Sequence, residues 1–140
     1  MPADNPTAAR YNTLQPYLII RNCVAALEFY VRALGATERM RMARPDGRIG
    51  HAEIQMGDSV VMMADEHPEI DALSPNHYGG SPVSLHLHVE DCDASFRRAI
   101  SAGATPVREP ADQPYGDRNA GVLDPFGYKW WFGSPLKKQK

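Results

Sequence analysis

Two stretches of the chain share one pattern of apolar and polar positions. Residues 20–37 read IRNCVAALEFYVRALGAT and residues 89–105 read VEDCDASFRRAISAGAT, with Cys23 and Cys92 aligned at a shift of 69 residues. In each stretch apolar side chains recur at helical spacing, which is typical of one buried stripe on an amphipathic helix. These apolar side chains are Leu27, Tyr30, Val31 and Leu34 in the first stretch and Phe96, Ala99 and Ile100 in the second. The pattern predicts two copies of one helix and therefore an internal duplication.

Both predicted helices have start and stop signals. Asn and Asp side chains are good N-caps, and Gly tolerates the left-handed backbone that ends a helix. The N-cap candidates are Asn22 or Cys23 in the first copy and Asp91 or Asp93 in the second. Gly35 and Gly103 stand where each helix should stop. The repeat therefore extends to the ends of the helices.

Strand-like segments flank each helix in the same order. Residues 83–89 alternate strictly, with Ser84, His86 and His88 on one face, which is typical of a half-buried strand. The predicted strands are 16–20, 37–43, 49–56 and 59–64 in the first half, and 83–89, 105–109, 118–124 and 128–133 in the second. We therefore expect an irregular arm over 1–13, βαβββ modules over 14–64 and 83–134, a Pro- and Gly-rich linker over 65–82, and a basic tail over 135–140, all in one domain. The linker could act as a lid.

Composition narrows the class of protein. The 140 residues carry a net charge of −2, with 43% hydrophobic and 23% charged residues, as in an ordinary globular domain. The near-neutral charge argues against a nucleic-acid surface, and no apolar run approaches the length of a membrane span. The two cysteines, which have no Cys-x-x-Cys spacing, favour a reduced compartment, so we expect a cytoplasmic protein.

The duplication and several local motifs resemble the vicinal oxygen chelate superfamily, which includes glyoxalase I, bleomycin-resistance proteins and extradiol dioxygenases. The motifs are Leu27-Glu28-Phe29-Tyr30 with Leu34-Gly35, Gly50-His51-Ala52-Glu53-Ile54 with Gly57-Asp58-Ser59-Val60, Tyr115-Gly116-Asp117-Arg118, and Asp124-Pro125-Phe126-Gly127-Tyr128. Together they look closest to the glyoxalase-like branch of phosphonate operons. The resemblance implies an α+β fold in which tandem βαβββ modules form a curved, incomplete barrel with a concave cleft. It also implies a divalent metal with four ligands, and a homodimer.

The positions that correspond to the family's metal ligands are mostly occupied by other residue types. The first falls on Gln15, which has a usable carbonyl oxygen, whereas the others fall on Val61 or Met62, on Ser84 and on Trp131. A thioether and an indole do not suit zinc, nickel or iron(II). We therefore expect a metal-free cleft that holds an aromatic or amphipathic small molecule, unless these side chains simply fill the barrel. The predicted ligand-binding residues are Gln15, Tyr17, Met62, Ser84, His86, His88, Arg118 and Trp131.

Histidines support a different prediction. His51 shares a strand face with Glu53, and His86 shares one with His88. The two pairs could form a displaced metal site or an acid–base pair, as in a metal-dependent lyase, isomerase or dioxygenase. They could also be inert polar residues on a wet face, or the protein could be a non-catalytic interaction module.

Arg118 also has two interpretations. Its guanidinium could bind a ligand carboxylate or phosphate at the cleft mouth. It could instead pair with Asp117, Asp124 or Glu53 and hold its strand in place.

Overall fold

The computed structural model describes residues 11–136, so residues 1–10 of the predicted arm and residues 137–140 of the predicted tail lie outside the described residues. In chain order the elements are β1 (Tyr17–Ile20), α1 (Cys23–Leu34), β2 (Thr37–Ala43), β3 (Ile49–Met56), β4 (Ser59–Asp65), the short 3₁₀ helix η2 (Pro68–Ile70), α2 (Pro75–Tyr78), β5 (Ser84–His88), α3 (Cys92–Ser101), β6 (Thr105–Asp112), β7 (Asp117–Leu123) and β8 (Lys129–Pro135). Each half therefore has the strand, helix and three strands that the sequence predicts.

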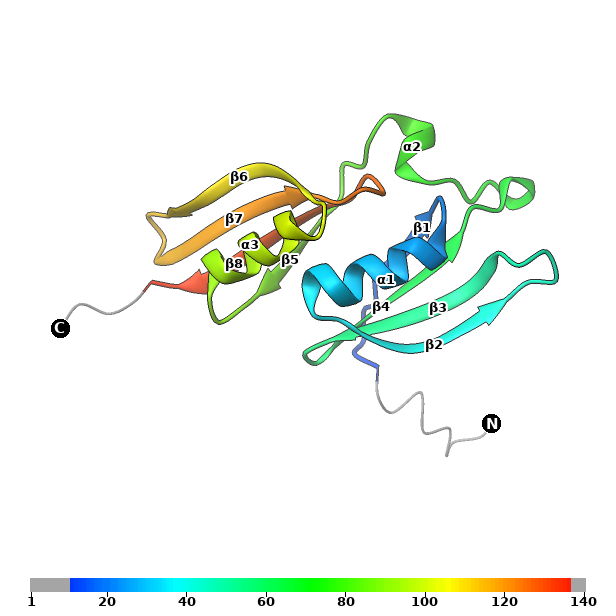
Figure 1. Ribbon diagram of the computed structural model, residues 1–140, viewed down its shortest axis with the longest axis horizontal. Helices are drawn as coiled ribbons and strands as arrows, with labels where there is room; N and C mark the ends of the chain where they lie inside the picture. Colours follow the sequence, from blue (N-terminus) through cyan, green and yellow to red (C-terminus); the bar gives the residue numbers. More distant parts are fainter. Residues whose placement is uncertain (1–10, 137–140) are drawn as a thin grey trace.

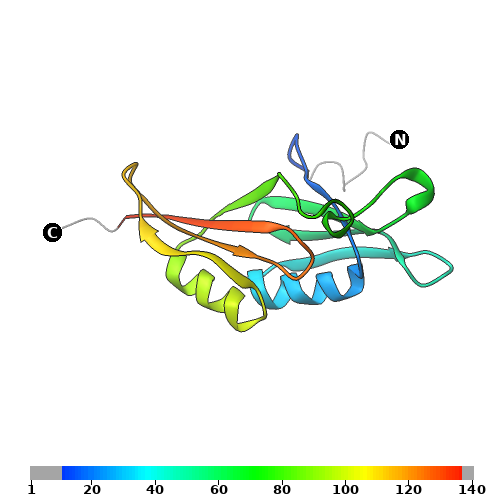
Figure 2. The same ribbon diagram turned by 90° about the horizontal axis from the view of Figure 1, so that it is seen from above.

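The two halves repeat one sheet topology. The first sheet has the order β1-β4-β3-β2 and the second the order β5-β8-β7-β6. In each, the first strand pairs in parallel with the last, and the other pairs are antiparallel. The helices α1 and α3 lie next to each other on the same side of both sheets (Figures 1 and 2). The α+β class and the tandem open modules are thus confirmed, and the two sheets do not close into a barrel.

Capping decides where both main helices begin. The side chains of Asn22 and Asp91 accept hydrogen bonds from the backbone N–H groups of Ala25 and Ala94, three residues further on. Of the candidate caps, Asn22 and Asp91 are therefore the ones used. After α1, Gly35 adopts φ +72°, a left-handed conformation that glycine adopts without strain.

One core joins the halves beneath the two sheets. The ring of Tyr30, on α1, packs against Phe126 and Trp130 of the second half. Its hydroxyl donates to the buried Asp124 at 2.5 Å, and the Trp130 indole N–H donates to the same oxygen at 2.8 Å. The other oxygen of Asp124 accepts the backbone N–H groups of Phe126 and Tyr128. The turn that begins at Asp124 therefore fastens the second half to α1.

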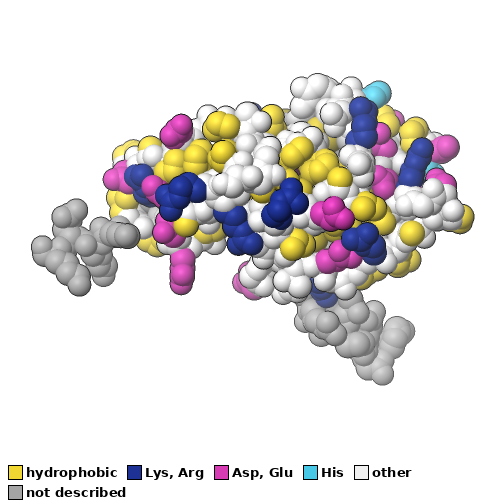
Figure 3. Space-filling view, viewed as in Figure 1, with side chains coloured by type: hydrophobic (Ala, Val, Ile, Leu, Met, Phe, Trp, Pro, Cys, Tyr) yellow, Lys and Arg dark blue, Asp and Glu magenta, His cyan; other side chains and the backbone are white. Residues whose placement is uncertain are grey.

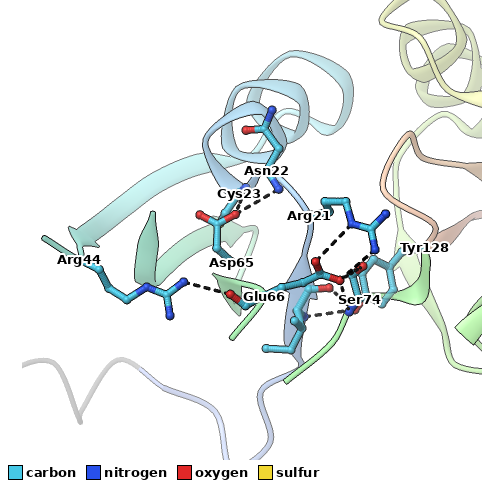
Figure 4. Close-up of polar contacts among 9 residues, drawn as sticks. Arg21, Asn22, Cys23, Arg44, Asp65, Glu66, Ser74 and Tyr128 are labelled. Carbon is cyan, nitrogen blue, oxygen red and sulfur yellow. Dashed lines mark hydrogen bonds and ion pairs between the residues drawn. The ribbon is translucent and has the colours of Figure 1, made fainter. Parts of the chain in front are cut away.

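The linker is tied to the end of β4 by a polar network (Figure 4). Glu66 accepts hydrogen bonds from the hydroxyl and backbone N–H of the buried Ser74, at 2.6 and 3.0 Å. Arg21 donates to the same carboxylate, and Arg44 donates to the backbone carbonyl of Glu66. Hydrogen bonds from Ser74 and Arg21 lower the pKa of Glu66 to about 2. This part of the linker is packed against the first half.

The predicted strand ends needed correction in the second half. β6 was expected to stop at residue 109, but it continues to Asp112 with register shifts around Arg108. Because β6 is an edge strand, Pro106 and Pro110 can belong to it without breaking a ladder on both sides.

The described surface carries both signs of charge. Acidic and basic side chains are interspersed on the face that bears the helices (Figure 3). Within residues 11–136, no helix combines the length and the apolar character that crossing a membrane requires.

Candidate functional site

Each sheet has a face directed away from α1 and α3, which we call the first and second open face (Figure 2). On the first, Tyr17, Met62 and Glu53 are neighbours across β1, β4 and β3. The second open face has a corresponding row of cross-strand neighbours. It consists of His86 on β5, Trp131 on β8, Gly121 on β7 and Arg108 on β6. The predicted residues Gln15, Tyr17 and Met62 therefore belong to one half, and Ser84, His86, His88 and Trp131 to the other. They lie on two different sheets.

The second open face presents an aromatic ring packed on the sheet. The Trp131 ring lies on Gly121, where a Cβ atom would stand only 2.5 Å from the ring atom Cζ3. The Arg108 guanidinium lies 5.0 Å from the centre of the indole ring, a cation–π distance. Arg108 is held there by the side-chain oxygen of Asn119, whose amide nitrogen donates to the Tyr115 hydroxyl. The indole thus packs on the sheet with a positive charge over its ring.

Two histidines border this surface. The His86 and His88 rings lie 5.1 Å apart, and the His86 ring folds over Gly133, whose added Cβ would be 2.8 Å from Nε2. The exposed Ser84 is at the start of the same strand, opposite Lys129. This face therefore combines an aromatic plane with polar donors at its edge.

The first open face holds a chain of hydrogen bonds. The Tyr17 hydroxyl lies 2.9 Å from His51 Nδ1, and His51 Nε2 lies 2.9 Å from Glu53 Oε2. Tyr11 donates to the same carboxylate oxygen at 2.7 Å, and Arg39 Nη1 lies 3.8 Å from the other oxygen. Glu53 is only 2% exposed, whereas Tyr17 is 47% exposed. A buried carboxylate is therefore connected through an imidazole to a phenol at the surface.

Neighbouring groups shift the pKa values of both ends of this series of hydrogen bonds. Burial alone would raise the pKa of Glu53, but hydrogen bonds from His51 and Tyr11 and the charge of Arg39 outweigh it, and the pKa lies below its usual range. Burial, together with nearby Cys23 and Glu53, raises the pKa of Tyr17. Near neutral pH, Glu53 is ionised and Tyr17 keeps its proton.

Two of the residues at the family's metal positions, Met62 and Trp131, do not fit a metal. Met62 lies beside Tyr17 on β4, and Trp131 lies beside His86 on β8. The last strand of each half therefore carries a thioether or an indole where a metal ligand would stand. His51 and Glu53 lie on a different sheet from His86 and His88. Among residues 11–136, no three His, Cys, Asp or Glu side chains gather closely enough to hold a metal ion.

Arg118 is not part of either open face. Its guanidinium forms a paired hydrogen bond with Asp93 on α3, at 2.6 and 3.1 Å, and a third bond with Asp112 at 2.8 Å. The interpretation as an ion-pairing residue fits this geometry, although the partners are neither Asp117 nor Asp124 nor Glu53. A cavity of about 540 Å³ lies at this end of the second half, and its lining includes Arg118 and the acidic residues Glu90, Asp91, Asp93 and Asp112.

These observations define a duplicated βαβββ protein with two open sheet faces. The sequence-family model of the Glyoxalase/Bleomycin resistance protein/Dioxygenase superfamily matches residues 10–132. The chain belongs to that superfamily. An uncharacterized protein of Mycobacterium bovis, Mb0911c, is 41% identical over 128 residues, which cover 89% of this chain and 84% of that protein. The anthracycline biosynthesis protein DnrV of Streptomyces peucetius is 29% identical over 131 residues, which cover 74% of this chain and 47% of DnrV.

Solved structures agree with the fold. The crystal structure of TioX from Micromonospora sp. ML1 has a TM-score of 0.68 and 26% identity, and the match covers 92% of this chain and all of TioX. Protein PA1353 from Pseudomonas aeruginosa has a TM-score of 0.70 at 24% identity, covering 89% of this chain and all of PA1353. This second likeness concerns the fold alone.

Proposed function

We propose that the protein binds a flat aromatic or amphipathic small molecule against Trp131, without a bound metal. The observation that carries the proposal is the indole packed directly on Gly121 with Arg108 over its ring. A planar ligand would stack on such a ring, and the guanidinium would favour a ligand with a phenolate or carboxylate. His86 and His88 would supply hydrogen bonds at the edge.

The comparison with DnrV suggests the class of ligand. DnrV is named for anthracycline biosynthesis, and anthracyclines are planar polycyclic compounds with phenolic hydroxyl groups. Their shape and acidity suit a site made of an indole and a guanidinium. We therefore propose a polycyclic aromatic ligand of this type.

A second copy of the chain would complete the site. Large side chains remain exposed on or beside both open faces, including Tyr17 at 47%, Met42 at 59% and Tyr115 at 66%. A homodimer that places the first open face of one chain over the second open face of the other would cover them and enclose the ligand. We place this dimer in the cytoplasm, since Cys23 and Cys92 are free and buried.

Binding to the anthracycline doxorubicin, followed by its fluorescence, tests the proposal. Loss of ring stacking in Trp131→Ala should weaken binding about tenfold or more. The matched control is Tyr78→Ala, which removes an exposed aromatic ring of α2 and should leave affinity unchanged. Equal affinity of Trp131→Ala and the unaltered protein would contradict the site.

Metal content tests the metal-free part of the proposal. The protein would be dialysed against zinc, nickel, manganese and iron(II) and analysed by mass spectrometry. We expect no stoichiometric metal to be retained. Retained metal that is lost in His86→Ala or Glu53→Ala would instead support the metal-dependent alternative.

A further inference from the structure

The three hydrogen-bonded groups on the first open face have defined donors and acceptors. Ionised Glu53 can only accept, so His51 Nε2 carries a proton and donates to it at 2.9 Å. In a neutral imidazole with its proton on Nε2, Nδ1 is the acceptor for the Tyr17 hydroxyl, which lies 2.9 Å away. The order phenol, imidazole, carboxylate is therefore fixed by the buried end of the chain.

The two ends of this chain differ in exposure. Tyr11 and Arg39 hold the carboxylate of Glu53 in place, and Glu53 is almost completely buried. Tyr17 lies at the surface of the open face, and its ring is tilted 43° to the His51 ring at a centroid distance of 5.5 Å. A ligand on this face can touch the phenol but not the carboxylate.

We propose that Tyr17, His51 and Glu53 form a proton-transfer site for conjugated carbonyl or phenolic ligands. The proposal deepens the binding function and rests on it, because the ligand is the planar molecule held between the open faces. Tyr17 would touch the reacting atom, while His51 would receive the proton and Glu53 would orient and stabilise the imidazolium. The inference goes beyond binding because it assigns the first open face a reaction.

The proposed step balances without another reactant. A proton on a carbon beside a ligand carbonyl passes to Tyr17 Oη while the Tyr17 proton passes to His51 Nδ1. The electron pair of the broken C–H bond stays in the ligand as an enolate. Return of the proton to a different ligand atom gives an isomer and restores neutral His51, so the reaction class is tautomerisation or isomerisation.

The probe 5-nitrobenzisoxazole tests the site directly. It is flat and aromatic, and removal of its C–H proton breaks the ring N–O bond to give a coloured phenolate. We expect the protein to open this ring faster than buffer, with the rate falling about 10²-fold in His51→Ala and at least about tenfold in Tyr17→Phe. Tyr17→Phe keeps the ring and changes an exposed residue, so it should fold even if His51→Ala does not.

The linker offers a matched control. His67 Nε2 lies 3.4 Å from Glu69 Oε1. This histidine–carboxylate pair lies in the linker and not on the first open face. His67→Ala should therefore leave the rate unchanged. The proton-transfer site is refuted if Tyr17→Phe opens the probe as fast as the unaltered protein, or if neither exceeds buffer.

Doxorubicin binding by the same variants separates the two proposals. Retained binding with a rate that depends on Tyr17 and His51 supports both. Retained binding without such a rate overturns the proton-transfer site alone. A Tyr17-dependent rate without doxorubicin binding contradicts the proposed ligand class but supports the relay.

Discussion

The two open faces belong to sheets with the same strand order and have different surfaces. Met62 and Trp131 occupy equivalent positions on the last strand of each half, and their partners on the next strand are Glu53 and Gly121. Gly121 has no side chain, so the indole can pack directly against the strand. At the equivalent position Glu53 fills the space and attracts hydrogen-bond donors. One cross-strand neighbour therefore decides whether the face becomes an aromatic plane or a polar network.

The first strands differ in the same way. Tyr17 is long enough to reach over β4 to His51 on β3, whereas His86 folds onto Gly133 of the adjacent strand. Duplication thus gave two identical scaffolds, and small changes in side-chain length gave them different chemistry.

The largest expected effect concerns the turn between the last two strands of each half. Asp124 is buried and accepts four hydrogen bonds, while Asp58 lies in the exposed turn of the first half. In Asp124→Asn the new NH₂ group would face the Trp130 indole N–H, which cannot accept. We expect the free energy of unfolding, measured in urea, to fall by about 3–5 kcal/mol.

Asp58→Asn is the control for this comparison and should change stability by less than about 0.5 kcal/mol. If both variants lost the same amount, the turn of the second half would not be the stronger anchor.

The next effect concerns the start of each helix. Asp65, at the end of β4, accepts the backbone N–H groups of Asn22, Cys23 and Ile49, whereas Ser134 at the end of β8 accepts only that of Cys92. Removing a carboxylate that accepts three backbone donors, two of them in buried hydrogen bonds, costs more than removing one hydroxyl. We expect Asp65→Ala to lose about 2–3 kcal/mol and Ser134→Ala about 1 kcal/mol in thermal or urea unfolding. A larger loss in Ser134→Ala would reverse the comparison.

Much of the fold could be predicted from local patterns. Helical periodicity, the caps Asn22 and Asp91, and the repeat predicted both main helices and the order of strands around them. Alternation also put His51 with Glu53 on one strand face. These features depend on neighbours along the chain, so a single sequence contains them.

The site depends on neighbours across strands, and alternation does not give cross-strand register. The reach of Tyr17 to His51 and the place of Trp131 over Gly121 needed that register. Arg39 was missed because it sits at a register shift of β2, where strict alternation breaks down. The prediction that Arg118 lines the cleft did not anticipate its pairing with Asp93 on α3.

A smaller effect concerns how the free energy of unfolding depends on pH at the ends of β4 and β8. Glu66 follows β4 and binds Ser74, with a pKa of about 2 against an ordinary value of 4.5, whereas Pro135 ends β8 and has no such group. A folded-state pKa below the unfolded value means that the stabilisation is complete above about pH 4.5 and is lost as the pH falls toward 2. Glu66→Gln should lose about 1–2 kcal/mol at pH 7 and approach the unaltered protein in acid.

Glu69→Gln is the matched control, since Glu69 is exposed in the same linker. It should show no comparable loss at pH 7. A difference between Glu66→Gln and the unaltered protein that stayed constant from pH 7 to pH 2 would contradict the role of the Glu66 charge.

The smallest expected change in stability tests the open faces themselves. In Gly121→Ala the new methyl would lie within 2.6 Å of two Trp131 ring atoms, so the half-buried indole must lift from the sheet. The cost should be about 1 kcal/mol or less, because the ring can move toward solvent. Acrylamide should then quench tryptophan fluorescence more strongly, since Trp130 is 1% exposed and Trp131 dominates the quenching. Gly133→Ala crowds His86 instead and should leave the quenching unchanged. Equal quenching of Gly121→Ala and the unaltered protein would mean that Gly121 does not keep the indole packed on the sheet, and the second open face would lose the feature that distinguishes it from the first.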